Sequence, residues 1–309
     1  MRLFTGSSHP ALAKSLSEEL KITLGKICLK TFSCGEKYVK LEETVRGKDV
    51  YILQTSAGKP DEDLVQLLLM CQAAQLSFAN IIHVIIPNFP YAMQDRIAEP
   101  REPISAKLIA QLIEQSGADH VITLDLHTSQ IQGFFSIPVD ALDAHGIFAE
   151  YFKAKKLADP VVVSPDAGGA KRAKKFADMI GADLAVIHKS RPRHHEVEVV
   201  EVAGDINGRP CILFDDMIDT GTSLVSAKKA LIKHGADKNV YAAATHGIFS
   251  GNAVKTLSAA GFRELVVTDS VPLSGKIIKG LKILPIAPLL AEVIRHIERR
   301  ESVTKIYEG

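Results

Sequence analysis

The sequence lacks several features that would assign a protein to a broad class at once. It has no apolar run long enough to span a bilayer, and its first residues, Met1–His9, lack the apolar core of a signal peptide. Its 37 basic residues are nearly balanced by 36 acidic residues, which argues against a basic surface for nucleic acid or for an anionic membrane. The sequence therefore predicts a cytoplasmic protein that binds neither nucleic acid nor membranes.

Cysteine is scarce, and its spacing excludes the common metal and redox motifs. The four cysteines lie far apart, with no C-x-x-C pair among them. We expect free thiols of a reducing compartment, two of them buried in apolar runs. Tryptophan is absent, and this absence excludes no function.

The order of the predicted elements indicates the fold class. Short apolar strands alternate with amphipathic helices through two successive halves of a 309-residue chain, which is long enough for two α/β domains. This alternation predicts two open, mostly parallel sheets, each with helices on both faces. We place the boundary near His145, with domains at residues 1–145 and 146–288, and expect the C-terminal helix at residues 289–309 to pack back onto the first domain.

The stretch Cys211–Leu224 holds the most informative pattern in the sequence. Its apolar start, Cys211–Phe214, is typical of a strand that is buried on both faces. Asp215 and Asp216 follow where we expect this strand to end. A loop of small and hydroxylated residues then leads into a predicted helix at residues 224–234. The loop residues are Asp219, Thr220, Gly221, Thr222 and Ser223.

Each part of this stretch suits one part of a sugar phosphate. A loop that opens a helix presents backbone N–H groups and the positive end of the helix dipole, which together bind phosphate. Carboxylates beside such a loop can accept hydrogen bonds from sugar hydroxyl groups. A solvated acidic turn before an ordinary N-capped helix is the plain alternative. The complete arrangement favours a sugar-phosphate site over that alternative.

Two further segments carry candidate ligands at the ends of predicted strands. In Leu124–Gln130, the pattern leaves His127 open as a metal ligand, a phosphate donor or a buried structural histidine. In Val163–Gly169, Asp166 precedes two glycines and could share Mg²⁺ with His127, although an aspartate in a tight turn is the plain alternative.

A cationic segment, His188–Arg193, follows another apolar strand. It contains Lys189 and Arg191, which could stabilise charge on a moving phosphoryl or diphosphoryl group. A solvated loop is the usual explanation of such a charge run, and both alternatives stay open on the pattern alone.

Taken together, the motifs resemble the ribose-phosphate diphosphokinase family, and the resemblance runs over nearly the whole chain. The matching segments are Phe4–Ser8, Phe89–Arg96, Pro103–Lys107, Asp125–Phe135, Ser164–Arg172, Phe214–Ser223, Thr245–Gly251 and Ala287–Glu292. The resemblance implies two phosphoribosyltransferase-like domains. It also implies transfer of the diphosphoryl group of ATP to the 1-hydroxyl of ribose 5-phosphate, with Mg²⁺ as cofactor.

The resemblance also implies a role for each candidate residue. Asp215 and Asp216 would hold the ribose hydroxyls, and residues 219–223 the 5-phosphate. Lys189 and Arg191 would act on the diphosphate, and His127 and Asp166 would bind Mg²⁺. The implied ATP-binding residues are Phe32, Cys34, Glu36, Met93, Gln94 and His127. Family members assemble from dimers, often into hexamers, so the resemblance implies a homo-oligomer.

Three features depart from the family pattern, all in the ATP-binding half. One is the loop Ile97–Arg101, which carries Glu99 where the family usually has a strongly basic loop; the other two are single positions. Cys34 stands in the F-S-C-G-E segment, where the family usually has a polar residue, and Met93 stands where the family has an arginine beside the phosphates. These departures motivate an alternative, a non-catalytic relative that regulates an active subunit. A phosphoribosyltransferase that acts on a base is disfavoured, because such enzymes lack the first-domain segments.

Overall fold

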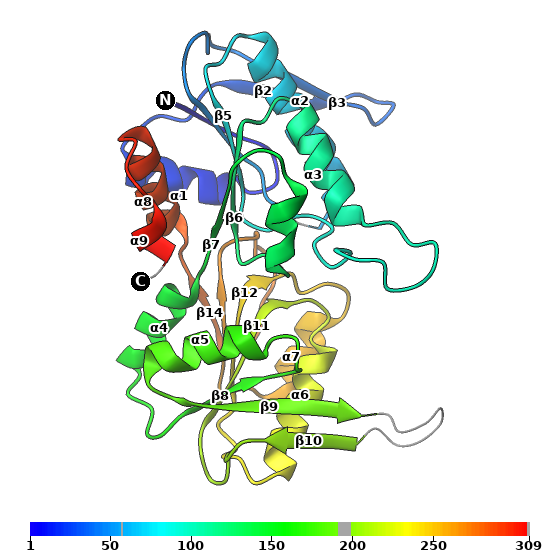
Figure 1. Cartoon of the computed structure of the whole chain (residues 1–309), viewed down its shortest axis with the longest axis vertical. Helices are drawn as coiled ribbons and strands as arrows, with labels where there is room; N and C mark the ends of the chain where they lie inside the picture. Colours follow the sequence, from blue (N-terminus) through cyan, green and yellow to red (C-terminus); the bar gives the residue numbers. More distant parts are fainter. Residues whose placement is uncertain (57, 191–198, 308–309) are drawn as a thin grey trace. The chain divides into compact units, whose positions relative to one another are not determined.

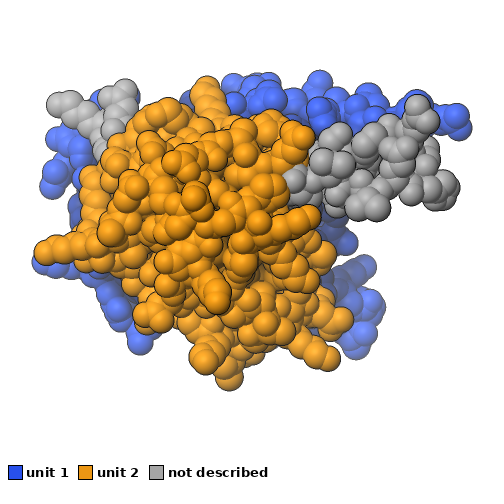
Figure 2. All heavy atoms as spheres, turned by 90° about the horizontal axis from the view of Figure 1, so that it is seen from below, with its two compact units in different colours: residues 1–143, 270–272, 285–309 blue, residues 144–269, 273–284 orange. Residues whose placement is uncertain are grey.

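The computed structural model describes residues 1–56, 58–190 and 199–307. The chain divides into two compact units, which Figure 2 distinguishes by colour. Unit 1 comprises Met1–Asp143, Ser270–Pro272 and Pro285–Gly309, and unit 2 comprises Ala144–Asp269 and Leu273–Leu284. In the described part of the chain, no helix is both long enough and apolar enough to cross a membrane.

Unit 1 is built on a five-stranded parallel sheet in the order β1-β4-β5-β6-β7. Its strands are β1 (Arg2–Thr5), β4 (Val50–Leu53), β5 (Ile82–Ile86), β6 (His120–Leu124) and β7 (Val139–Leu142). Every residue of β4, β5 and β6 is buried, because helices cover both faces. Figure 1 shows α1 and α8 along one side and α2 and α3 along the other. These helices are α1 (Pro10–Leu20), α2 (Pro60–Leu76), α3 (Ser105–Gln115) and α8 (Ala287–Glu298), with η1 (Ser129–Phe134) and α9 (Thr304–Tyr307) as short additions.

A separate antiparallel hairpin packs against α2 in unit 1. It consists of β2 (Ile27–Thr31) and β3 (Lys37–Leu41), and Thr31 pairs with Lys37 at its outer end. The inward-facing apolar side chains of the hairpin lie against the core that α2 also contacts. The turn between the two strands carries Phe32, Cys34 and Glu36, three of the predicted ATP-binding residues.

Unit 2 is built on a seven-stranded sheet in the order β10-β9-β8-β11-β12-β13-β14, in which only β10 is antiparallel to its neighbour. Its strands are β8 (Val161–Ser164), β9 (Asp183–Ser190), β10 (Val199–Ala203), β11 (Cys211–Ile218), β12 (Tyr241–Gly247), β13 (Glu264–Thr268) and β14 (Leu281–Leu284). One face is covered by α4 (His145–Ala154) and α5 (Ala170–Ile180), the other by α6 (Thr222–Lys233) and α7 (Ala253–Ala260).

The predicted fold class is confirmed, because both sheets are mostly parallel and flanked by helices. Cys71 and Cys211 are buried and all four cysteines are free, as expected. The end of β11 was predicted wrongly: the strand continues past Phe214 to Ile218, because β12 goes on pairing with it as far as Gly247. Strands β7 and β14 were missed, because most of their residues are at least partly exposed, unlike those of β4 and β8, which are equally short but fully buried and were predicted.

Candidate active site

The acidic pair of unit 2 lies within the last part of β11. The Asp216 side chain is 3% exposed and that of Asp215 is 29% exposed. Arg172, from the first turns of α5, places its Nη1 2.9 Å from Asp216 Oδ1 and 3.3 Å from Asp215 Oδ1. The Asp216 backbone N–H also donates to Asp215 Oδ1 at 2.9 Å. A single guanidinium nitrogen therefore bridges the two neighbouring carboxylates.

Burial strongly affects the protonation of this pair. Loss of hydration and then the nearby charge of Asp216 raise the pKa of Asp215 to about 8, while Arg172 opposes the rise. The two carboxyl groups titrate as a coupled pair, because they share hydrogen bonds and a counter-ion. The raised pKa therefore favours a proton on this pair.

The loop between β8 and α5 lies beside the same acidic pair. Its Gly169 N–H donates to Asp166 Oδ1 at 3.0 Å, and the Ser164 hydroxyl donates to the Asp166 carbonyl at 2.6 Å. A Cβ at Gly169 would lie 2.9 Å from Ser164 Oγ and 3.9 Å from Asp215 Oδ1, so only glycine allows this approach without a shift. The structure thus brings exposed Asp166 to the same strand edge as the acidic pair.

The predicted phosphate loop leads from β11 directly into α6. Gly221 is the N-cap of α6 and has a φ of 76°. Among the described residues, no N-cap side chain accepts a hydrogen bond from the N–H groups of the first turn. Thr222 and Ser223 are exposed and form the first turn of α6, which begins two residues before the predicted start. The N–H groups of that turn point along the helix axis toward the loop, as phosphate binding requires.

Asp219 is tied to the segment that follows β12. It accepts a hydrogen bond from the Ser250 hydroxyl, and its carbonyl accepts from the Ser250 N–H at 3.2 Å. Lys276 lies near this carboxylate; burial lowers the pKa of Lys276, and the Asp219 charge opposes that change. Sequence reasoning gave no role to Arg172, Ser250 or Lys276. Arg172 and Ser250 stood inside matching motifs, while Lys276 had no signal.

Five of the six ATP-binding candidates are exposed and lie on two segments of unit 1, whereas the sixth, His127, is half-buried and follows β6. In the hairpin turn, Phe32 is 50% exposed, and its N–H donates to the Glu36 carbonyl at 2.8 Å. Gly35 has a φ of 97°, a conformation that glycine adopts without strain, and Cys34 beside it is exposed. The turn is therefore well defined, although its side chains are open to solvent.

The second segment runs from Phe89 to Arg96. Met93 is 61% exposed, and the Gln94 side chain accepts a hydrogen bond from the Ser105 hydroxyl at the start of α3. The Thr128 hydroxyl donates to Asp95 Oδ2 at 2.6 Å. This contact brings the loop that carries His127 next to the segment that carries Gln94.

The remaining candidates are placed only in part. Lys189 is the second-last residue of β9, and Arg191 lies outside the described residues. His127 belongs to unit 1 and Asp166 to unit 2.

Residues 1–117 match a family model described as the N-terminal domain of ribose phosphate pyrophosphokinase, and residues 192–308 match the phosphoribosyl synthetase-associated domain. A curated ribose-phosphate pyrophosphokinase from Clostridium acetobutylicum is 44% identical over 311 residues, covering 100% of this chain and 97% of the relative. The chain belongs to the ribose-phosphate pyrophosphokinase family. Its counterpart from Bacillus subtilis is also 44% identical, over 99% of this chain and 97% of the relative.

The structural comparison agrees with this family. A crystal structure of phosphoribosylpyrophosphate synthetase from Mycobacterium smegmatis matches with a TM-score of 0.92 at 41% identity, covering 97% of this chain and 99% of that one. The family predicted from the motifs is confirmed, since pyrophosphokinase and diphosphokinase name the same activity. The prediction of a transferase enzyme is confirmed with it.

Proposed function

We propose that this enzyme transfers the β,γ-diphosphoryl group of ATP to the 1-hydroxyl of ribose 5-phosphate. The sugar oxygen attacks the β-phosphorus, the bond between the β-phosphorus and the α,β-bridging oxygen breaks, and the hydroxyl proton is lost. The products are 5-phosphoribosyl 1-diphosphate and AMP. Membership of the family favours this catalytic function over a non-catalytic regulatory relative.

One observation carries the sugar-phosphate half of the proposal: an acidic pair bridged by Arg172 lies on β11, the strand that leads through a short loop into the start of α6. Asp215 and Asp216 accept hydrogen bonds from the ribose hydroxyls, and the loop from Asp219 to Ser223 binds the 5-phosphate. The helix dipole and the N–H groups offset the phosphate charge, while the carboxylates orient the sugar.

The catalytic and metal residues are assigned by their positions in the motifs. Lys189 and Arg191 neutralise charge on the diphosphate as it moves. His127 and Asp166 would supply a nitrogen and an oxygen ligand for Mg²⁺, which would reduce the charge of the ATP phosphates. Asp166 fits this assignment, because it is exposed and its Oδ1 already accepts from the Gly169 N–H, which orients the carboxylate.

The nucleotide binds on the exposed segments of unit 1. Phe32 offers a ring face to the adenine, Cys34 and Glu36 lie at the same turn, and Met93 and Gln94 lie beside the triphosphate.

We further propose a homo-oligomer in the cytoplasm that is built from dimers, such as a hexamer. Exposed apolar side chains on α2 and α3 support assembly, because their burial between subunits is favourable. They are Leu69, Leu76, Leu108 and Leu112.

The decisive test is turnover by the purified chain alone with ATP, Mg²⁺ and ribose 5-phosphate, followed by phosphorus NMR. We expect AMP and 5-phosphoribosyl 1-diphosphate in equal amounts. Formation of ADP would mean attack at the γ-phosphorus and would refute the proposed reaction. A folded sample that binds ribose 5-phosphate but turns over no nucleoside triphosphate would favour the regulatory alternative.

A further inference from the structure

The first turn of α2 is strongly acidic, and its residues make hydrogen bonds and ion pairs to other segments of unit 1. It contains Asp61, Glu62 and Asp63 in a row, where acidic residues interact favourably with the helix dipole. Each of the three residues also bonds to a different segment of unit 1. These contacts suggest that the turn does more than begin a helix.

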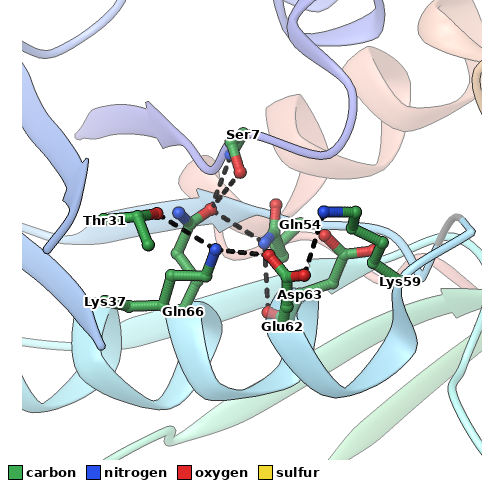
Figure 3. Close-up of polar contacts among 8 residues, drawn as sticks. All are labelled: Ser7, Thr31, Lys37, Gln54, Lys59, Glu62, Asp63 and Gln66. Carbon is green, nitrogen blue, oxygen red and sulfur yellow. Dashed lines mark hydrogen bonds and ion pairs between the residues drawn. The ribbon is translucent and has the colours of Figure 1, made fainter. Parts of the chain in front are cut away.

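Glu62 holds the hairpin. Lys37, on β3, places its Nζ 2.5 Å from Glu62 Oε2 and 3.1 Å from the Thr31 hydroxyl on β2. Lys59, the N-cap of α2, pairs with the other carboxylate oxygen of Glu62 at 3.0 Å. Figure 3 shows Lys37 between Thr31 and Glu62, with Lys59 on the far side of the carboxylate. The Lys37 side chain is only 14% exposed, so its ammonium group is held in one place.

The position of this ion pair on the hairpin matters. Thr31 and Lys37 are the last paired residues before the turn. The turn they enclose carries Phe32, Cys34 and Glu36. Fixing this strand pair to α2 therefore fixes the base of the turn, while the apolar side chains of the hairpin fix its body.

Asp61 holds the Phe89–Arg96 segment, the second segment that carries predicted ATP-binding residues. The Tyr91 hydroxyl donates to Asp61 Oδ1, and Tyr91 precedes Met93 by two residues and Gln94 by three. Tyr91 has a φ of 58°, a conformation that is costly for a bulky residue and needs outside contacts to hold it. The third residue of the acidic turn, Asp63, contacts a further segment: its backbone carbonyl accepts a hydrogen bond from Gln54 Nε2 at 3.0 Å.

Two neighbouring carboxylates thus anchor two segments that are far apart in the sequence. We propose that the first turn of α2 positions the hairpin turn and the Met93–Gln94 segment for the nucleotide, with Lys37 and Glu62 as positioning residues. This inference rests on the proposed function. The inference extends the proposed function, because it assigns a positioning role to side chains that are not expected to touch the substrate.

The expected effect is on ATP alone. Ion pairs near the surface contribute little to stability, so Lys37→Met should raise the KM for ATP by roughly three- to tenfold and leave kcat nearly unchanged. The KM for ribose 5-phosphate should stay within about twofold, because the hairpin belongs to unit 1 and the acidic pair to unit 2. Lys37→Arg should retain most of the affinity, since it keeps the cation.

The experiment is a double-mutant cycle of Lys37→Met, Glu62→Gln and the combined variant. If Lys37 and Glu62 affect ATP binding through their ion pair, the double variant raises the KM for ATP no further than the single variant with the larger effect. Lys40→Met is the matched control, because Lys40 is an exposed cation on the same strand, and it should leave the KM unchanged. Tyr91→Phe tests the Asp61 contact and should also raise the KM for ATP.

Several results would overturn the inference: an unchanged KM for ATP in Lys37→Met, an equal change in Lys40→Met, additive effects in the cycle, or an equal rise in the KM for ribose 5-phosphate. If the wild-type chain shows no turnover, the proposed function fails. Calorimetric binding of a non-hydrolysable ATP analogue then tests the positioning separately. Weaker binding by Lys37→Met than by Lys40→Met would support it, and equal binding would refute it.

Discussion

The acidic pair of unit 2 and the two predicted ATP-binding segments of unit 1, Phe32–Glu36 and Phe89–Arg96, are built in opposite ways. Asp216 sits in a central strand with 3% of its side chain exposed, whereas Phe32 and Met93 are 50% and 61% exposed on a hairpin turn and a loop. A buried charge needs its partner, while an exposed residue can change at little cost to the fold. A substitution at Cys34 or Met93 is therefore expected to disturb the fold less than a substitution in the acidic pair.

The largest effect is expected from Arg172→Gln. Removing the cation leaves the buried Asp216 carboxylate and the half-buried Asp215 carboxylate without their counter-ion, and such a loss costs several kcal/mol, so kcat/KM for ribose 5-phosphate should fall roughly 100-fold or more. Lys174→Gln, on the same helix, removes an exposed cation paired with Asp178 and should leave activity unchanged. Similar losses in both variants, measured in steady-state assays, would contradict the comparison.

The pH dependence is the second test. Because the pKa of Asp215 is raised to about 8, the pair loses its last proton as pH rises through that value. The ionised pair is the better acceptor for ribose hydroxyls, so kcat/KM for ribose 5-phosphate should rise between pH 7 and 9 with a midpoint near 8. The substrate phosphate titrates near pH 6 and stays ionised throughout this range. A flat profile, or the same midpoint in Asp215→Asn, would contradict this assignment.

A smaller effect is expected on the exposed side. Met93→Arg places a cation beside the predicted triphosphate position without disturbing the core, so the KM for ATP should fall by roughly three- to tenfold. The KM for ribose 5-phosphate should not change. Steady-state kinetics with each substrate varied in turn would measure both. An unchanged KM for ATP would show that residue 93 lies away from the phosphates.

Much of the candidate site could be predicted from the sequence, because its signals are local. The apolar run before Asp215, the small residues around Gly221 and the helix that follows lie within 14 residues, Cys211–Leu224. The end of β11 could not be predicted, because it depends on β12, which lies about 30 residues further on and extends the ladder. Local propensity does not contain that information.

By itself, the sequence determined the α/β alternation, the family and the residue types of the sugar-phosphate loop, since these depend on composition and on neighbours along the chain. Only the tertiary structure decided which charges meet. Arg172 reaches a pair more than 40 residues away, and Lys37 reaches Glu62 across 25 residues. These contacts, and the raised pKa of Asp215, follow from sheet register and burial, which arise only when distant segments pack together.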